Sequence, residues 1–192
     1  MLGGDVMHPI TYSDLEVVER AVRTVRASAV VLPATDLSGF HGFPLIEWSA
    51  GLADRLRGGA GPMLDRATLS LWESWPSGVE CAPPPAPLRI LGFASTASWR
   101  HAVRATRALR GFGAGCVLTT TRPSVIRLSE ADFAGVYVIQ VSHDGANEVL
   151  VHGRGGIESA SRMVATRYWE ERLLAHALRV GAVRRPPWTG QA

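Results

Sequence analysis

The hydrophobic pattern changes period twice between residues 88 and 121. An apolar run from Leu88 to Ala94 predicts a buried strand, and residues 99–110 place apolar side chains at the 3.6-residue spacing of a helix. Glycines at positions 111, 113 and 115 end this helix, and a second apolar run covers residues 116–121. A strand, a helix and a strand joined by short loops predict a right-handed crossover between two parallel strands.

Asp144-Gly145 is a typical hairpin turn between apolar runs at residues 135–141 and 148–152. Further periodic segments predict three more helices and one more strand, at residues 14–27, 62–75, 157–180 and 29–33. We therefore expect an α/β or α+β fold with helices packed on a mixed, partly parallel sheet. Its parts are one βαβ crossover at 88–121, a C-terminal β-hairpin at 135–152 and a long C-terminal helix.

In two segments the hydrophobic residues recur with neither the helical nor the strand period. Residues 34–62 mix aromatic residues with glycine and proline, which is typical of a lid or binding loop, with a short helix near residues 46–56. Residues 125–128 predict a short edge strand, followed by a turn at 129–132.

The proline-rich segment 76–87 predicts a stiff connector. We expect a single domain over residues 1–192, because each side of this connector alone would have a thin core. The alternative is a helical subdomain at 1–75, followed by an α/β core at 88–181 and a flexible tail at 182–192.

All twenty basic residues are arginine. The absence of lysine excludes a pyridoxal phosphate Schiff base and a P-loop, since both need an amine or ammonium group. The cofactor is therefore unknown from the sequence, and no spacing of cysteine or histidine makes a convincing metal site.

The net charge of +3 and the pI near 9.4 allow an anionic partner without requiring one. Cys81 and Cys116 match no zinc or redox spacing, so two free thiols and a cytoplasmic location are expected. No apolar run reaches the ~20 residues of a membrane-spanning helix, so no membrane partner is expected.

Polar side chains follow the first strand of the crossover and begin its helix. Ser95, Thr96 and Ser98 stand where free helix amides and a partial positive charge favour an anion. Helix capping alone also explains these residue types, and it is the more common role.

A second polar junction precedes the C-terminal helix. Arg154 stands among glycines that include Gly155 and Gly156, where backbone amides and a guanidinium group could hold an anion. His152 would be the general acid or base, because the pKa of histidine lies near neutrality. A glycine-rich turn with a solvated arginine is the alternative.

The two junctions form one crevice only if residues 148–152 run parallel to residues 88–94. Seven residues would then surround a phosphate- or carboxylate-binding pocket: Ser95, Thr96, Ser98, His152 and Arg154 from the two junctions, with Thr121 and Arg122, which follow the second strand of the crossover. The opposite strand direction would separate them, and the sequence does not decide between the two. A metal site made by His143, Asp144 and His152 is disfavoured, because the hairpin separates the two histidines by over ~10 Å.

Arg100, Arg104 and Arg107 form a stripe on one helix face. Such a stripe is usually a solvated surface, and less often a nucleic-acid contact. Trp169 and Leu173 give the C-terminal helix a second apolar side, which would suit a homodimer.

The leading functional hypothesis is a small cytoplasmic α/β enzyme that acts on an anionic small molecule, with His152 moving the proton. The alternative is a non-catalytic interaction or assembly module that forms a dimer. Nucleic-acid binding through the arginine stripe is a weaker third hypothesis.

Overall fold

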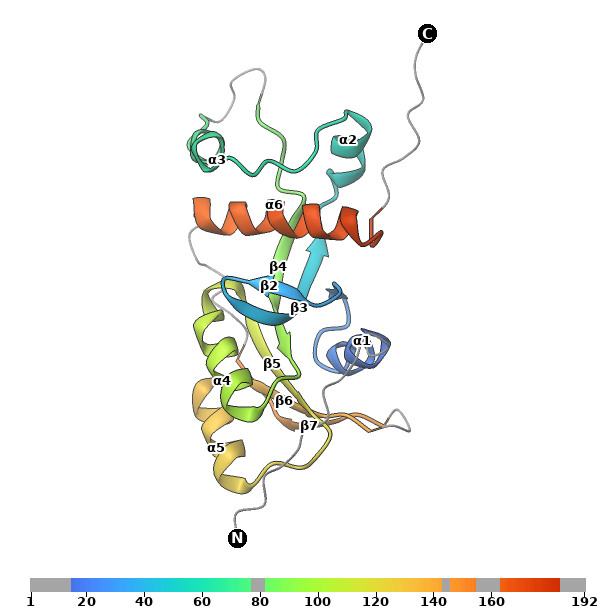
Figure 1. Cartoon of the computed structure of the whole chain (residues 1–192), viewed down its shortest axis with the longest axis vertical. Helices are drawn as coiled ribbons and strands as arrows, with labels where there is room; N and C mark the ends of the chain where they lie inside the picture. The colour runs from blue at the N-terminus through green and yellow to red at the C-terminus, as the bar shows by residue number, and fades with distance from the viewer. Residues whose placement is uncertain (1–14, 77–81, 143–145, 155–162, 184–192) are drawn as a thin grey trace. The chain divides into compact units, whose positions relative to one another are not determined.

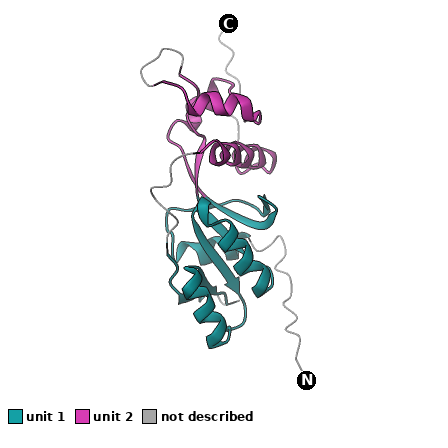
Figure 2. Cartoon of the chain, turned by 90° about the vertical axis from the view of Figure 1, so that its left-hand side faces the viewer, with its two compact units in different colours: residues 1–45, 91–158 teal, residues 46–90, 159–192 magenta. Residues whose placement is uncertain are grey.

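The computed structural model describes residues 15–76, 82–142, 146–154 and 163–183. The chain forms two compact units, each built from two separate parts of the sequence (Figure 2). Unit 1 contains residues 1–45 and 91–158, and unit 2 contains residues 46–90 and 159–192. A single domain stays a prediction. The proline-rich segment 76–87 lies inside unit 2 and does not separate the two units.

The described residues form a seven-stranded mixed sheet with helices, as predicted. The strand order is β1-β3-β4-β5-β6-β7, and β2 pairs with β3 (Figure 1). The strands are β1 (Val30–Val31), β2 (Thr35–Leu37), β3 (Phe40–Trp48), β4 (Leu88–Ser95), β5 (Ala114–Thr119), β6 (Tyr137–Gln140) and β7 (Glu148–Val151). The helices are α1 (Leu15–Arg23), α2 (Leu52–Arg57), α3 (Arg66–Glu73), α4 (Trp99–Ala108), α5 (Val125–Ala134) and α6 (Val164–Arg179), with a 3-10 turn η2 (Arg110–Phe112).

Three neighbouring strands of unit 1 run parallel. β4 pairs with β5, and β5 pairs with β6, so the predicted crossover at residues 88–121 is confirmed. A second crossover, β5-α5-β6, follows it. β7 returns antiparallel to β6, which confirms the hairpin pairing, while the predicted turn at residues 143–145 lies outside the described residues.

Alternating side chains of β5 serve two cores on opposite faces of the sheet. Cys116 and Leu118 pack in a cluster with Val18 and Val22 of α1. Val117, between them, packs with Ala102 and Val103 of α4. This strand is buried along its whole length, which explains its unbroken apolar sequence.

α4 lies close against the sheet because β5 offers a glycine there. A Cβ atom on Gly115 would lie 2.6 Å from the Cβ of Thr106. The Thr106 hydroxyl donates to the carbonyl of Ala102 at 2.9 Å, so this side chain is held in place on α4. Gly115 therefore sets the spacing between the helix and the strand.

The expectation of an irregular segment at residues 34–62 is wrong for its first part, because β2 and β3 occupy it. Ser38 and Gly39 have φ of 52° and 85° and join the two strands in a tight hairpin. Gly42 suggests an interruption of regular secondary structure, but glycine is required here by packing. A Cβ atom at this position would lie 2.6 Å from the carbonyl oxygen of Ala94. The expected short helix within this segment is α2.

The predicted edge strand at residues 125–128 is also wrong, because these residues begin α5. Ser124 caps the helix by accepting from the amide of Arg127, and Gly135 ends it with φ of 69°. These caps outweigh the strand preference of Val125 and Ile126, whose side chains stay 78% and 82% exposed. The C-terminal helix is confirmed, but it begins at Val164, after the extended backbone of Met163.

Unit 2 contains a buried carboxylate between two arginines. Glu171 of α6 is fully buried, and its Oε1 and Oε2 atoms accept from Arg55 of α2 at 2.8 and 2.7 Å. Arg167, one turn earlier on α6, donates to Oε1 at 3.0 Å. The backbone amide of Met63 donates to Oε2 at 3.0 Å. We call these three side chains the Arg55–Glu171–Arg167 cluster.

The same arginines also bind the irregular backbone around them. Arg55 donates to the carbonyls of Gly61 at 2.8 Å and Pro85 at 3.1 Å. Arg167 donates to the carbonyl of Pro84 at 2.7 Å. Residues 82–86 belong to no strand or helix, so the guanidinium donors satisfy carbonyls that have no partner in regular secondary structure. The cluster therefore attaches the proline-rich segment to α2 and α6.

Replacing Gly115 by alanine should lower the free energy of unfolding by about 1–3 kcal/mol, because the new methyl group overpacks against Thr106. Gly111→Ala is the matched control, since no atom lies within 4 Å of a Cβ there. Urea denaturation followed by circular dichroism measures both. Equal stability of the two variants would contradict the close packing.

Replacing Glu171 by alanine should lower the free energy of unfolding by about 3–5 kcal/mol, because buried Arg55 loses its carboxylate partner and buried Arg167 loses one of its two. Glu47→Ala removes the partner of Arg89 in an exposed pair and should cost about 0–1 kcal/mol. The same denaturation measurement compares them. A loss for Glu171→Ala no larger than for Glu47→Ala would show that the cluster does not stabilise unit 2.

Candidate functional site

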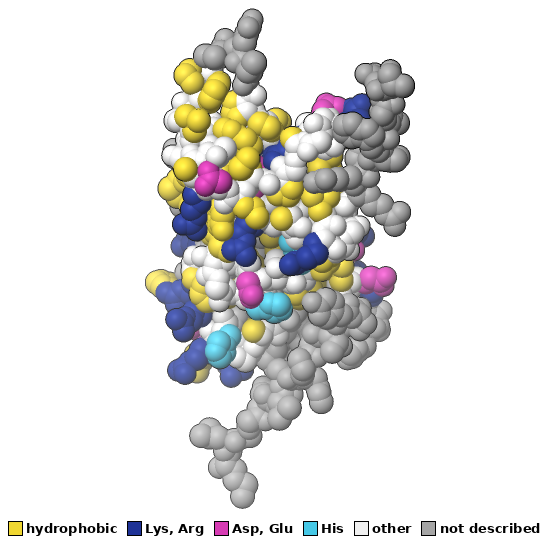
Figure 3. Space-filling model, turned by 45° about the horizontal axis from the view of Figure 1, so that its top comes forward, with side chains coloured by type: hydrophobic (Ala, Val, Ile, Leu, Met, Phe, Trp, Pro, Cys, Tyr) yellow, Lys and Arg dark blue, Asp and Glu magenta, His cyan; other side chains and the backbone are white. Residues whose placement is uncertain are grey.

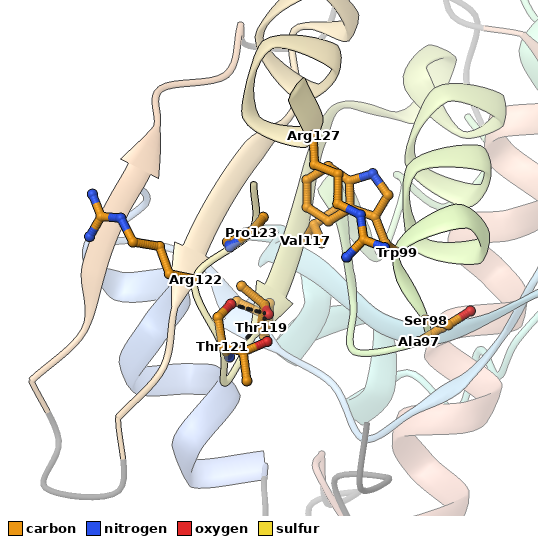
Figure 4. A pocket seen from close by; sticks show the side chains of 10 residues that line it. Ala97, Ser98, Trp99, Val117, Thr119, Thr121, Arg122, Pro123 and Arg127 are labelled. Atoms are coloured by element: carbon orange, nitrogen blue, oxygen red, sulfur yellow. Dashed lines mark hydrogen bonds between the residues drawn. The ribbon is translucent and has the colours of Figure 1, made fainter. Parts of the chain in front are cut away.

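Three of the predicted site residues meet at the carboxyl ends of β4 and β5. Ser98, Thr121 and Arg122 line one hollow of about 100 Å³, together with Trp99, Thr119 and Arg127 among others. α4 begins on one side of it and α5 on the other, so helix N-termini flank the hollow (Figure 4). We call this hollow the carboxyl-edge pocket.

His152 and Arg154 lie at the other end of the sheet. β7 is antiparallel to β6, and Val151 pairs with Val138, near the amino end of β6. The amide of Arg154 donates to the carbonyl of Gly135 at 2.9 Å, before β6 begins. Because β4, β5 and β6 are parallel, this end is opposite to the one that carries Ser98. A single crevice was expected only if residues 148–152 ran parallel to residues 88–94. They do not, so the two polar junctions do not share a crevice.

Of the other predicted residues that the structure describes, Ser95 and Thr96 do not line the pocket either. Ser95 is 1% exposed, and its hydroxyl accepts from the amide of Ala97 at 3.4 Å, so it has a local structural role. Thr96 is half-buried in the following loop. Gly155 and Gly156 lie outside the described residues.

The floor and one wall of the pocket are built by the loop after β5. Thr119 is 5% exposed, and its hydroxyl donates to the carbonyl of Thr121 at 2.7 Å, which folds the loop back on the strand end. The amide of Thr121 donates to the same hydroxyl at 3.3 Å. Figure 4 shows these two threonines side by side below Arg127 and Trp99. The turn orients Thr121 and Arg122 at the sheet edge.

Arg127 and Trp99 close the pocket on the helix side. The Arg127 guanidinium carbon lies 5.9 Å from the centre of the Trp99 ring, in a cation–π contact. The Trp99 indole nitrogen donates to Glu130 at 3.0 Å. This contact joins the first turn of α4 to α5 and holds a cation beside the pocket.

Arg122 points away from Arg127 in Figure 4. Its Nη1 atom donates to the Glu148 carboxylate at 3.1 and 3.2 Å, and both side chains are more than half exposed. Exposed ion pairs contribute only ~0–1 kcal/mol, so a competing anion can replace Glu148 at little cost.

His101 was not predicted as a site residue from the sequence. The Ser98 hydroxyl and the Nδ1 atom of His101 lie 2.8 Å apart at the start of α4, so Ser98 hydrogen-bonds this ring and caps no amide with its side chain. A serine three residues before a histidine at a predicted helix start was the available signal, since N-cap and N3 side chains lie side by side. A serine and a histidine in this geometry can share and transfer a proton.

Cys116 offers no chemistry at this edge. Its side chain is fully buried in β5, and burial raises the pKa of the thiol to about 12. The reactive thiolate is therefore negligible at neutral pH. Across the part of the chain that the structure describes, no three side chains of the metal-binding types gather as a site, and no helix could span a membrane.

The C-terminal helix does not offer the second apolar side that suggested a homodimer. Leu173 is 1% exposed and is already buried within the chain. Trp169 is half-buried, with the Arg172 guanidinium 4.8 Å from its ring centre. The expected dimer contact through Trp169 and Leu173 therefore has little free apolar surface.

No model of a known protein family matches this chain. Searches among curated proteins and among solved structures also found no similar protein.

Proposed function

We propose that the protein binds a small anionic molecule through a phosphate or carboxylate group in the carboxyl-edge pocket. The supporting observation is that one hollow at the ends of two parallel strands is lined by Arg122, Arg127, Ser98 and two threonines. Ligands of open α/β sheets bind at this edge, where helix N-termini contribute free amides and partial positive charge.

The size of the pocket limits the group that it can hold. A hollow of about 100 Å³ is smaller than the ~300–1,000 Å³ of drug-sized sites. It suits one compact anionic group, while the rest of the ligand stays outside. Arginine supports such binding through paired donors that match the oxygens of a phosphate or carboxylate.

The proposal extends to an enzyme in which His101 replaces His152 as the proton carrier. His101 is hydrogen-bonded to Ser98, which lines the pocket, whereas His152 lies at the opposite end of the sheet. A histidine beside a bound anion can act as a general acid or base near neutral pH. A cytoplasmic location belongs to the same proposal and is supported by the free thiol of Cys116.

A second candidate function is an assembly module that associates with another copy of the chain. Unit 2 exposes Leu64, Leu71 and Met163 by 50%, 57% and 61%. Leu64 and Leu71 belong to the segment around α3, and Met163 precedes α6, the helix that α3 contacts. Figure 3 shows a face on which hydrophobic side chains gather in its upper part. Exposed apolar side chains that form a continuous patch favour protein contacts.

Replacing Arg122 by glutamine should weaken the binding of inorganic phosphate about tenfold, because a charge-assisted hydrogen bond is lost. Arg154→Gln is the matched control, since Arg154 is also an exposed arginine of unit 1 but lies at the far end of the sheet. Isothermal titration with phosphate measures both affinities. An equal loss in the two variants, or phosphate binding that neither variant changes, would reject the pocket.

The assembly candidate predicts a stable oligomer that Leu71→Glu dissociates, because a buried unpaired carboxylate disfavours the contact. Sedimentation velocity gives the mass of the native chain and of the variant. Val180→Glu, at a residue 42% exposed beyond the end of α6, is the control and should leave the mass unchanged. A native chain that sediments as a monomer would exclude this function.

A further inference from the structure

A second hollow in unit 1 lies between α4 and α5. It has a volume of about 570 Å³, and its lining includes Arg100, Arg104, Arg107 and Arg127 with a single acidic residue, Glu130. We call it the arginine groove. Its two walls are joined by the hydrogen bond from Trp99 to Glu130 and by the Arg127–Trp99 contact.

The groove has an excess of available positive charge. Arg100, Arg104 and Arg107 are exposed, and none of them forms an ion pair with a carboxylate of the described residues. Glu130 already accepts a hydrogen bond from Trp99. The three α4 arginines recur with helical spacing and extend over about 10 Å of one wall. An extended polyanion can therefore contact several of them at once.

The floor of the groove gives little for an apolar partner to bind. Val103 is only 4% exposed, and the guanidinium group of Arg127 lies over the Trp99 ring. An amphipathic acidic helix binds by inserting its apolar side chains into a hydrophobic groove, and the arginine groove has no exposed apolar floor to receive them. A second copy of this chain that docked through the same groove would bring its own arginines there and be repelled.

The outer side of α5 presents an exposed aromatic ring. Phe133 is 84% exposed, one helical turn beyond the groove residue Glu130. Residues three apart are neighbours on a helix surface, so Phe133 stands beside the groove. A positively charged groove that follows the backbone, together with an aromatic ring for base stacking, is typical of single-stranded nucleic-acid binding.

We propose that the arginine groove binds a single-stranded nucleic acid, with phosphates along Arg100, Arg104 and Arg107 and a base stacked on Phe133. This inference is independent of the phosphate pocket, since none of these four residues lines that pocket. Single-stranded chains suit the site better than a duplex, because their unpaired bases can reach the phenyl ring.

The experiment measures binding of a fluorescent oligothymidylate by anisotropy over a series of salt concentrations. The triple variant R100Q/R104Q/R107Q should lower the slope of log affinity against log salt by about 2, since each single-strand phosphate contact contributes ~0.7. The control R20Q/R23Q/R57Q removes the same charge from exposed positions outside the groove and should keep the slope. Equal slopes for the two triple variants would overturn the proposal.

Phe133→Ala tests the stacking contact separately. It should weaken oligothymidylate binding by about tenfold and leave the salt slope unchanged, because stacking involves no counterion release. Val125→Ala removes another exposed side chain of α5 and should leave the affinity unchanged. Equal effects of the two single variants would contradict the stacked base.

Competition identifies the class of partner. Unlabelled single strands should displace the probe at lower concentration than a duplex or polyglutamate. Stronger competition by polyglutamate would assign the groove to an acidic protein segment and overturn the nucleic-acid proposal, as would tighter binding of the duplex. Arg122 lines the carboxyl-edge pocket and not the groove, whereas Arg100, Arg104 and Arg107 line only the groove. The Arg122→Gln variant and the triple variant therefore distinguish failure of one proposal from failure of the other.

Discussion

The direction of the strands in unit 1 decides which side chains can act together. β4, β5 and β6 are parallel, so their polar carboxyl ends, with the first turns of α4 and α5, lie at one edge. β7 is antiparallel, so it brings its first residue, Glu148, to that edge and carries His152 away from it. The Arg122–Glu148 ion pair and the isolation of His152 are two consequences of the same hydrogen-bond ladder.

Unit 2 is held together by a different kind of interaction. Its irregular backbone has carbonyls that no strand or helix satisfies, and Arg55 and Arg167 donate to them while sharing the carboxylate of Glu171. A buried charge is expensive unless it is paired and hydrogen-bonded, and here each partner meets both conditions. The cluster therefore specifies one arrangement of a segment that hydrophobic packing alone would leave loosely defined.

The parts of the fold that the sequence predicted are those whose burial is periodic. β4, α4 and β5 alternate between unbroken apolar runs and a helical stripe, so their types followed from the pattern alone. α5 and β3 were missed for opposite reasons. Two β-branched residues at the start of α5 suggested a strand, although Ser124 and Gly135 mark helix ends. In β3, Gly42 suggested a loop, although it is the residue that lets β3 approach Ala94 of β4.

The candidate site was only partly predictable, because strand direction is not encoded in the residues that form the site. Ser98, Thr121 and Arg122 were placed correctly at one edge, since they follow two strands of a single crossover. The position of His152 depended on whether the hairpin strand runs parallel or antiparallel to the strands of that crossover, and no local sequence pattern predicts this direction. His101 was missed because its contact with Ser98 becomes visible only when the helix start is fixed.

The two hollows of unit 1 share a wall, and this limits how they can be occupied. Trp99 and Arg127 line both the carboxyl-edge pocket and the arginine groove. An anion in the pocket that recruits the Arg127 guanidinium would draw it from the Trp99 face and uncover the ring towards the groove. A freed indole face would add a second stacking surface to that of Phe133, so occupation of the pocket would strengthen binding of a single strand in the groove. By linkage, a strand in the groove would then raise the affinity of the pocket for its anion by the same factor.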